Sequence, residues 1–560
     1  MRRTVVAGAI AAGLVLVGSL PAAADEPLPR AVETHLSGSA QILLGGGVGG
    51  AVGGGQVDNS TCATSGNPAS NIDVSCDDPV SPDNETPIVA DPANPNHLLG
   101  GSNDYKIQVK GSTIQERVPT GFFVSFDGGH TWKDGSIPMG NGASGGNGDP
   151  SPAFDDRFGT AHMAQLSAAQ GQNGPNAGHI SVSVSTSFDG GLTWRPPVTV
   201  AVGHAAISPS AASVFLDKEW LVADNNPSSP HYGRLYLTWD KLVFSKGAFA
   251  QSLIEFSYSD DAGKQWSRPK PISGFSPTCT ANQGFAGAPN QCDESFFSYG
   301  VVLPNGHLAV GFINQQHAAA WEEPNEYENQ ILVVRSSNGG ATWSNPVHVA
   351  DLEDGGQEAV VFSDYPANVD GRATQTGYQF RTGSWGNLGV DKTTGELYAV
   401  WTDNRDGLHD VAHPVTDTNV FVSTSSDGGA TWSSTKRVTS GSKDKWFPWV
   451  TARGGQVVVA YQQETATGKY VTRIARSSNV GASWTQQTVS TAQSDADHSV
   501  WFQAHAPGCD TCSRFIGDYI GADIDTLGRV HVLWTDMRRS LSVPALGRTG
   551  KAEDAEYARR

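Results

Sequence analysis

The chain has 560 residues, of which 65 are Gly and 9% are aromatic, and its formal net charge is −19. This charge argues against nucleic acid and against anionic membrane surfaces as partners, because both repel an acidic protein. Apolar residues lack a helical period, which excludes a helical bundle and indicates an all-β chain.

Residues 1–24 have the pattern of a secretory signal peptide. Arg2 and Arg3 precede an apolar run from Val5 to Leu20, and Ala22 to Ala24 form a small-residue cleavage site. No later stretch is long and apolar enough to cross a membrane as a helix. We therefore expect a secreted, extracellular and monomeric protein with no membrane or nucleic-acid partner.

Residues 25–84 are expected to form an N-terminal strap. Residues 45–60 are rich in Gly and predict a flexible linker. The segment from Glu33 to Leu44 is our candidate for a strand that closes the fold described below.

One eight-residue pattern recurs six times in the chain, typically as Ser-x-Asp-Gly-Gly-x-Thr-Trp or a close variant. Its Asp or Asn can accept hydrogen bonds from nearby backbone N–H groups, and its Gly residues supply positive φ, so each copy predicts a tight hairpin turn. The copies are Ser125–Trp132, Ser187–Trp194, Ser259–Trp266, Ser336–Trp343, Ser425–Trp432 and Ser477–Trp484.

A second repeated feature is a Gly followed by alternating apolar residues, which predicts a half-buried strand leaving a hairpin turn. These turns are expected at Gly159, Gly233, Gly306, Gly395, Gly455 and Gly528, with Asn96 in the same role for the first unit. Each unit then has four antiparallel strands, A to D, with the Gly in the A–B turn and the octet in the C–D turn. Radially repeated sheets of this kind form a β-propeller.

The seven A–B turns predict seven blades over residues 85–540. Because the chain has six octets, six blades are the alternative. The last blade lacks its own outer strands, so we expect N-terminal residues to complete it and close the ring. Residues 541–560 are expected to form a charged C-terminal tail.

The six Cys residues fall into three local couples, and in an exported protein each couple is expected to form a disulfide bond. The couples are Cys62 with Cys76, Cys279 with Cys292, and Cys509 with Cys512.

The six octets resemble those of the Asp-box, or BNR-repeat, family, which is best known from sialidases. The segments Asn84–Tyr105 and Phe515–Arg538 are similar to those of exported sialidase-like members. The resemblance implies a β-propeller, a glycan partner and glycoside hydrolase activity. The chain departs from the family in lacking the early Arg-Ile-Pro element, and only Arg117 lies nearby, so the carboxylate-binding Arg triad is not carried over.

Strand order predicts where a site would lie. Strand A begins and strand B ends on the same face of the ring, whereas the octets turn on the opposite face. The Asp residues of the octets are therefore expected to be structural. Large side chains near the ends of most B strands, including Trp401 and Trp534, precede polar residues two positions later, including Asp403 and Asp536. Asp104 holds the same polar position in the first unit, after the small residue Ser102.

Two B strands continue in parallel as Trp-Thr-Asp-x-Arg, and these segments give the candidate substrate-binding residues. They place Arg405 and Arg538 two residues beyond Asp403 and Asp536. A guanidinium group can bind a sugar carboxylate through two hydrogen bonds. The alternative is that each Arg pairs with its neighbouring Asp and shapes the loop.

The starts of the A strands are also polar, and they give the candidate catalytic residues. Sialidases use a Tyr nucleophile that a carboxylate activates. Asp518 and Tyr519, together with Asp104, offer these groups if the ring closes. Other polar residues at strand A starts are Glu85, Asp149, Asp217, Lys218, Glu219, Asp293 and Glu294.

Three functional hypotheses follow. The first is a sialidase-like exo-glycosidase that binds an acidic sugar at the channel mouth. The second is a glycan-binding or interaction propeller without catalysis. The third is a scaffold with a structural Ca²⁺ ion near Asp104, Asn314, Asp403 and Asp536, since Ca²⁺ prefers oxygen ligands; we assign no metal ligands and no other cofactor from the sequence.

Overall fold

The protein is described by a computed structural model that covers fifteen stretches of the chain. They are residues 62–76, 82–110, 113–139, 146–168, 180–204, 212–246, 248–281, 288–321, 328–355, 364–369, 371–410, 412–466, 468–500, 514–544 and 547–560. The signal peptide, the linker and the candidate strand Glu33 to Leu44 lie outside these stretches. Within them the one helix is the short 3₁₀ turn η1 (Ala496–His498), and no helix is long and apolar enough to span a membrane.

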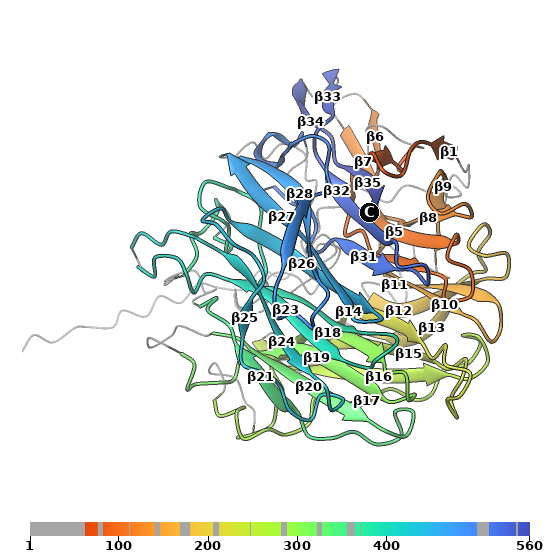
Figure 1. Ribbon diagram of the computed structural model, residues 1–560, viewed down its shortest axis with the longest axis vertical. Coiled ribbons are helices and arrows are strands. Elements are labelled where there is room, and N and C mark those ends of the chain that lie inside the picture. The colour runs from red at the N-terminus through yellow and green to blue at the C-terminus, as the bar shows by residue number, and fades with distance from the viewer. Residues whose placement is uncertain are drawn as a thin grey trace, which may run out of the picture.

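Seven antiparallel sheets stand around a common centre as the blades of a propeller (Figure 1). Blades 2 to 4 follow the chain outward from the centre. Their strands are β10 (Gly146–Asp155), β11 (Thr160–Ala168), β12 (Ile180–Ser187) and β13 (Val198–Val202); β14 (Ala212–Ala223), β15 (Leu235–Ser245), β16 (Ala248–Ser259) and β17 (Lys270–Pro271); and β18 (Ser295–Val302), β19 (Leu308–Asn314), β20 (Gln330–Ser336) and β21 (Val347–Asp351).

Blades 5 and 6 repeat this order. Their strands are β22 (Trp385–Val390), β23 (Leu397–Asp403), β24 (Asn419–Ser425) and β25 (Lys436–Arg437); and β26 (Lys445–Arg453), β27 (Gln456–Ala466), β28 (Lys469–Ser477) and β29 (Thr485–Thr488), with β30 (Ser494–Asp495) added beside β28.

Blade 1 draws on a longer stretch of chain than expected. Its strands are β3 (Asp83–Asn84) and β4 (Ile88–Ala90), which both pair with β5 (Leu98–Asp104), then β8 (Thr120–Ser125), β9 (Thr131–Ser136) and, outermost, β1 (Cys62–Ser65). In the sequence, the connection from β5 to β8 forms a separate hairpin of β6 (Lys106–Lys110) and β7 (Thr113–Arg117).

Blade 7 joins the two ends of the described chain. Its order is β31 (Gly521–Ile524), β32 (Val530–Asp536), β35 (Asp554–Arg559) and β2 (Ile72–Asp73). N-terminal residues therefore complete the blade, but they do so through β2. The expected C-terminal tail is wrong, because β35 is the third strand and a hairpin of β33 (Ser540–Val543) and β34 (Arg548–Lys551) precedes it.

The first strands of the blades form the innermost ring. Each of β10, β14, β18, β22 and β26 contacts the first strand of the next blade, and β31 contacts β4 to close the circle. The large residues predicted near the B-strand ends lie in the core, since Trp239, Phe312, Trp401 and Trp534 are all 0% exposed. Their burial fixes the B strands between neighbouring sheets.

The octets form the C–D turns as predicted. In the first copy the Ser125 hydroxyl donates to Asp127 Oδ1 (3.0 Å), and Asp127 Oδ2 accepts from the Thr131 hydroxyl (2.7 Å). The Trp132 ring packs against Tyr557 of blade 7 at 4.7 Å between centroids. A hydrogen bond from Thr431 lowers the pKa of the equivalent Asp427 to about 2. These carboxylates are held by the turn and are structural.

A disulfide joins Cys279 to Cys292, which confirms one of the three expected couples. Cys509 and Cys512 lie outside the described residues.

Candidate functional site

A repeated irregularity in the first strands shapes one end of the central channel. Pairing of the A and B strands shifts register in blades 2, 3, 4 and 6, and a residue inside each shift has positive φ. Glu85 has the same conformation between β3 and β4. The residues are Glu85 (φ 55°), Asp149 (φ 53°), Lys218 (φ 51°), Phe297 (φ 56°) and Phe447 (φ 50°). Positive φ is unfavourable for side chains of this size, and such strain gathers at functional sites.

Charged side chains from several blades converge at this end. Lys218 Nζ lies 2.9 Å from Asp518 Oδ2, 3.6 Å from Glu85 Oε1 and 3.9 Å from Asp149 Oδ2. Arg381 Nε donates to Asp518 Oδ1 at 2.8 Å. Together with Glu219, which adjoins Lys218, these residues make up what we call the central charge cluster.

Aromatic rings enclose the cluster. Trp220 lies 5.0 Å from Tyr299 and 5.2 Å from Trp449, and Trp449 lies 5.9 Å from Tyr519, measured between ring centroids. Lys218 Nζ lies 5.3 Å from the centroid of the Tyr519 ring. Four blades contribute these rings: Trp220, Tyr299 and Trp449 each lie two residues beyond a residue with positive φ, and Tyr519 lies two residues beyond Gly517 (φ 86°). The rings exclude water and strengthen every charge interaction beside them.

Several carboxylates of the cluster are buried without a hydrogen-bond partner. Neither side-chain oxygen of Glu85, Asp149 or Glu219 has one, and these residues are 0%, 2% and 3% exposed. Burial raises the pKa of the Glu85 carboxyl well above its usual value; the charge of Lys218 opposes this rise, and the charges of Asp149 and Asp518 add to it. Burial also raises the pKa of Glu219, with a further contribution from Asp149.

Asp518 has the opposite electrostatic character. Burial alone would raise its pKa, but Arg381 and Lys218 hold the pKa well below its usual value. Burial would likewise lower the pKa of Lys218, yet Asp518, Glu85 and Asp149 together raise it. The cluster thus combines a carboxylate that stays ionised with carboxyl groups that tend to keep a proton, a division used in acid–base catalysis.

Of the three predicted catalytic residues, Asp518 and Tyr519 lie at this cluster. The Tyr519 hydroxyl donates to the Pro150 carbonyl at 3.3 Å, and burial, together with the charge of Glu85, raises the pKa of the phenol well above its usual value. Asp104 lies in blade 1, where it accepts from the Ser136 hydroxyl (3.1 Å) and pairs with Lys106 (3.0 Å).

The predicted substrate-binding residues of blade 5 form a closed clasp. Asp403 Oδ1 accepts from Arg405 Nε at 2.8 Å, and Asp403 Oδ2 accepts from the Trp401 indole N–H at 2.9 Å. Arg405 also donates to the backbone carbonyl of Asp351, at the end of the outermost strand of blade 4. Its guanidinium group therefore joins two blades.

Blade 7 repeats the clasp. Arg538 donates to both oxygens of Asp536, each at 2.7 Å, and Asp536 Oδ2 accepts from the Trp534 indole at 2.9 Å. Arg538 also reaches Asn71, next to the outermost strand β2, at 2.8 Å. The alternative in which each Arg pairs with its neighbouring Asp matches both segments, and both Trp side chains are fully buried.

Sequence reasoning noted Glu85, Asp149 and Lys218 as polar strand starts but assigned them no role. Each of the three residues occupies the same position in its blade, namely the irregular position near the start of strand A. Aligning the blades at that position would have shown that the three belong together. Arg381 precedes β22 in a loop that belongs to no repeat, so no pattern pointed to it.

The Ca²⁺ hypothesis finds no cluster to support it in the described part of the chain. The groups of three or more His, Cys, Asp or Glu residues there that could hold a metal are His317, His348 and Asp351, and Glu353, Asp364 and His409. Neither contains Asp104, Asp403 or Asp536. The Asn314 side chain donates to Ser295 and Gln316 instead.

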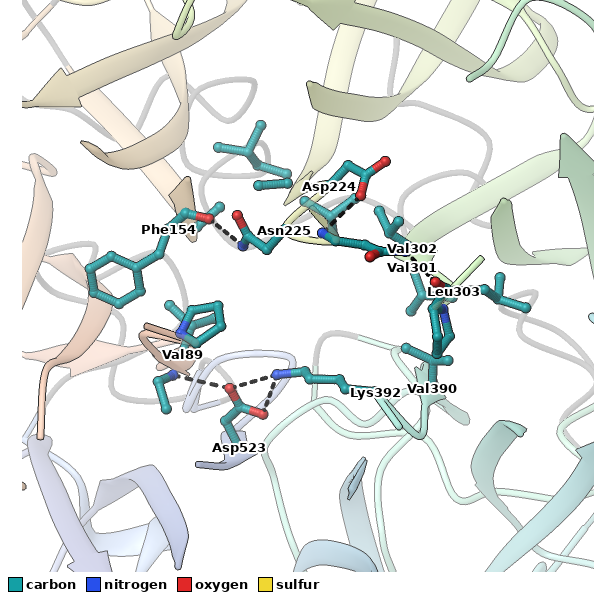
Figure 2. Close-up of a pocket in the computed structure, with 18 of the residues that line it drawn as sticks. Val89, Phe154, Asp224, Asn225, Val301, Val302, Leu303, Val390, Lys392 and Asp523 are labelled. Atoms are coloured by element: carbon teal, nitrogen blue, oxygen red, sulfur yellow. Dashed lines mark hydrogen bonds and ion pairs between the residues drawn. The ribbon is translucent and has the colours of Figure 1, made fainter. Parts of the chain in front are cut away.

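At the opposite end of the channel, where the first strands finish, lies a cavity of about 390 Å³ (Figure 2). Its wall is largely apolar, with Phe154, Val301 and Val390 among its side chains. Asp523 accepts from Lys392 Nζ (2.8 Å), the Ala90 backbone N–H (3.0 Å) and the Thr451 hydroxyl (3.1 Å). This carboxylate is therefore fully partnered.

No protein-family model and no curated protein matches the chain. Solved structures are similar to it at low identity. A protein of unknown function from Dyadobacter fermentans is 14% identical (TM-score 0.40; 73% of this chain and 93% of that one), and the Hadza microbial sialidase Hz136 is 11% identical (TM-score 0.40; 89% and 94%). The NanB sialidase of Streptococcus pneumoniae is 9% identical (TM-score 0.40; 90% and 99%). At these values the similarities carry no argument about the chemistry of the site.

Proposed function

We propose that the protein is a secreted, sialidase-like exo-glycosidase that acts on a terminal sugar of a glycan at the central charge cluster. The observation that carries the proposal is the set of buried carboxylates without a hydrogen-bond partner that gather around the single ammonium group of Lys218. Burial of such groups destabilises the folded protein, a cost that a functional role would explain, and their perturbed pKa values are typical of active sites.

The two kinds of carboxyl group match the needs of glycoside hydrolysis, which uses a proton donor and a second, ionised carboxylate. Glu85, with its raised pKa, is the candidate acid, and Asp518, with its lowered pKa, is the candidate ionised partner. Both lie beside Lys218 Nζ. The raised pKa of Tyr519 disfavours a phenolate nucleophile. We therefore assign its ring to the aromatic wall of the cluster.

Arg381 is the candidate group for binding an acidic sugar. It is 5% exposed, two of its nitrogens bind Asp518, and its Nη1 is buried without a hydrogen-bond partner. A sugar carboxylate would satisfy this donor. This assignment replaces Arg405 and Arg538, whose guanidinium groups are engaged in the clasps.

The test is turnover of a panel of fluorogenic aryl glycosides, with a sialoside first, by the purified mature protein. We expect Glu85→Gln to lower kcat/KM by about 100-fold or more, because it removes the acid. Glu255→Gln is the matched control, since Glu255 is 3% exposed and pairs with Lys241 (2.9 Å) in blade 3. An equal loss in both variants would reject the assignment of Glu85.

A glycan-binding propeller without catalysis is the second candidate. The observation that favours it over hydrolysis at the cluster is the size of the cavities there, which measure about 30 Å³ and 10 Å³ and are too small for a sugar ring, so the glycan would bind elsewhere on the propeller. Binding on a glycan array, combined with no release from any aryl glycoside by the folded protein, would select this function over hydrolysis.

A further inference from the structure

Two His side chains and a carboxylate that do not belong to the central charge cluster converge at the edge of blade 4. His317 Nδ1 lies 2.8 Å from Asp351 Oδ1, and His348 Nε2 lies 2.9 Å from the same oxygen. The two imidazole rings are 5.4 Å apart between centroids and inclined by 70°. From this geometry we infer a binding site for one divalent transition-metal ion, with His317, His348 and Asp351 as its protein ligands.

The spacing of the ligand atoms suits such an ion. One potential ligand atom from each residue lies within 4.8 Å of the others. Tetrahedral Zn²⁺ with bonds of about 2.0–2.1 Å places neighbouring ligands about 3.3 Å apart. Small side-chain rotations that lengthen the two N···O contacts, together with a change of tautomer that moves each ring proton to the other nitrogen, would admit the ion. Without a metal, the carboxylate accepts an N–H from each ring.

Three elements hold the residues in place. His348 and Asp351 both belong to β21, and Asp351 pairs with Gln330 of β20. His317 follows β19, in the connection to β20. Arg405 of the neighbouring clasp donates to the Asp351 backbone carbonyl at 3.1 Å. The ligands thus come from a paired strand and a loop that ends on the same face of the ring.

The donor set selects the class of metal. Two imidazole nitrogens favour Zn²⁺, Co²⁺, Ni²⁺ or Cu²⁺ over Ca²⁺ and Mg²⁺, which prefer oxygen alone. The side chains are partly exposed, at 15% for His317, 33% for His348 and 39% for Asp351, so an ion can enter from solvent. Three protein ligands leave a coordination position open to water or to another ligand.

The experiment uses Co²⁺ as the spectroscopic probe, added to mature protein that carries no His tag, and Zn²⁺ in competition. We expect one Co²⁺ per chain with visible d–d absorption, displaced by Zn²⁺ and lost in His317→Ala and in His348→Ala. His307→Ala is the matched control, because His307 is exposed in the β18–β19 turn, and it should bind as the wild type does.

Urea unfolding of each variant without metal shows whether the substitutions leave the fold intact. Zn²⁺ should stabilise the wild type and His307→Ala, and it should leave the other two variants unchanged. Absence of stoichiometric Co²⁺ binding in the wild type would overturn the proposal. Binding that persists in His317→Ala and His348→Ala but disappears in His409→Ala would assign the metal to the other cluster and would equally overturn it.

Discussion

The two ends of the central channel differ in how their charges are satisfied. At the end where the first strands finish, the Asp523 carboxylate binds Lys392, two hydrogen-bond donors of neighbouring strands surround it, and the adjacent cavity is large. At the other end Lys218 faces three acidic residues, and two of these have no hydrogen-bond partner. The comparison shows that the large cavity and the carboxylates without hydrogen-bond partners lie at opposite ends of the channel.

The difference has a structural origin. The last residues of the first strands continue regular pairing into the A–B turns, so their polar groups meet backbone partners. Near their starts the same strands shift register, and the residues with positive φ lie inside these shifts, where the regular ladder of backbone hydrogen bonds is interrupted. Gly517 occupies the equivalent place in blade 7 with φ of 86°, and a Cβ atom there would come within 2.8 Å of the Glu85 nitrogen.

The largest expected effect is that of Lys218→Met. The substitution leaves Asp518, Glu85 and Asp149 without the ammonium group that faces them, in a site where the Lys218 side chain is 5% exposed. Removal of one partner from a buried charge group costs about 3–5 kcal/mol. Urea unfolding at neutral pH should show this decrease in the free energy of unfolding.

Lys241→Met provides the matched control in the same blade. Lys241 also pairs with a buried carboxylate, Glu255, at 2.9 Å, but its side chain is 35% exposed. The expected loss is about 1 kcal/mol or less. Equal losses in the two variants would mean that Lys218 contributes no more to the free energy of unfolding than an ordinary, partly exposed ion pair does.

The next effect in size concerns the clasp of blade 7. Arg538→Met leaves the buried Asp536 carboxylate with the Trp534 indole but without the guanidinium group, and it removes the bonds to Asn71 and Thr491. Loss of hydrogen bonds to a charged group costs about 1.5–3 kcal/mol. We expect this decrease in unfolding free energy with KM for an active glycoside unchanged.

Arg405→Met in blade 5 is the natural comparison, because the same clasp recurs there. A rise in KM without a loss of stability, in either variant, would restore the interpretation in which these Arg residues bind the sugar. The measurement therefore separates the two meanings of the Trp-Thr-Asp-x-Arg segments.

A third prediction concerns pH. The folded-state pKa of Glu85 is raised above its usual value of 4.5, so the folded protein keeps a proton that the unfolded chain loses above that pH. Stability from this group is therefore present below pH 4.5 and declines as pH rises toward the folded pKa, by up to about 1.4 kcal/mol per pH unit. Glu85→Gln should reduce the decline in unfolding free energy between pH 5 and pH 7.5.

Asp427→Asn serves as the control for pH. The folded pKa of this octet residue is about 2 and its usual value is 3.8, so the stability it contributes is present above pH 3.8 and is lost as pH falls toward 2. Its effect should be constant from pH 5 to pH 7.5. If Glu85→Gln also shows a constant difference, the raised pKa of Glu85 is refuted.

Much of the fold could be predicted from the sequence, because the turn chemistry repeats locally. The octets and the Gly turns define where the strands end, and seven blades follow from their number. The error at the C-terminus has a clear cause. In β35 the charged residues Asp554 and Glu556 alternate with Ala555 and Tyr557, and Arg539 and Arg538 neutralise them, so a paired strand looked like a tail.

The site was harder to predict, because its residues come from separate blades and from an irregular feature of the strands. Asp518 and Tyr519 were found since they begin a repeated strand. Arg405 and Arg538 were favoured because a free guanidinium group and a paired one look alike in sequence. One extra residue in a strand decides which side chains at the strand start face the channel. The pattern of apolar and polar residues in the sequence does not reveal this extra residue.

The smallest expected effect tests the satisfied end of the channel. Lys392→Met removes the ion pair with Asp523, but the Lys392 side chain is 39% exposed, and Asp523 keeps the Ala90 backbone and Thr451 hydroxyl donors. A solvent-exposed ion pair contributes about 0.2–1 kcal/mol, and its contribution falls with added salt. Urea unfolding at low and high salt should show a small loss that shrinks as salt increases. A loss as large as that of Lys218→Met would remove the distinction between the two ends, whereas a small one would locate the electrostatic strain of the ring at the central charge cluster.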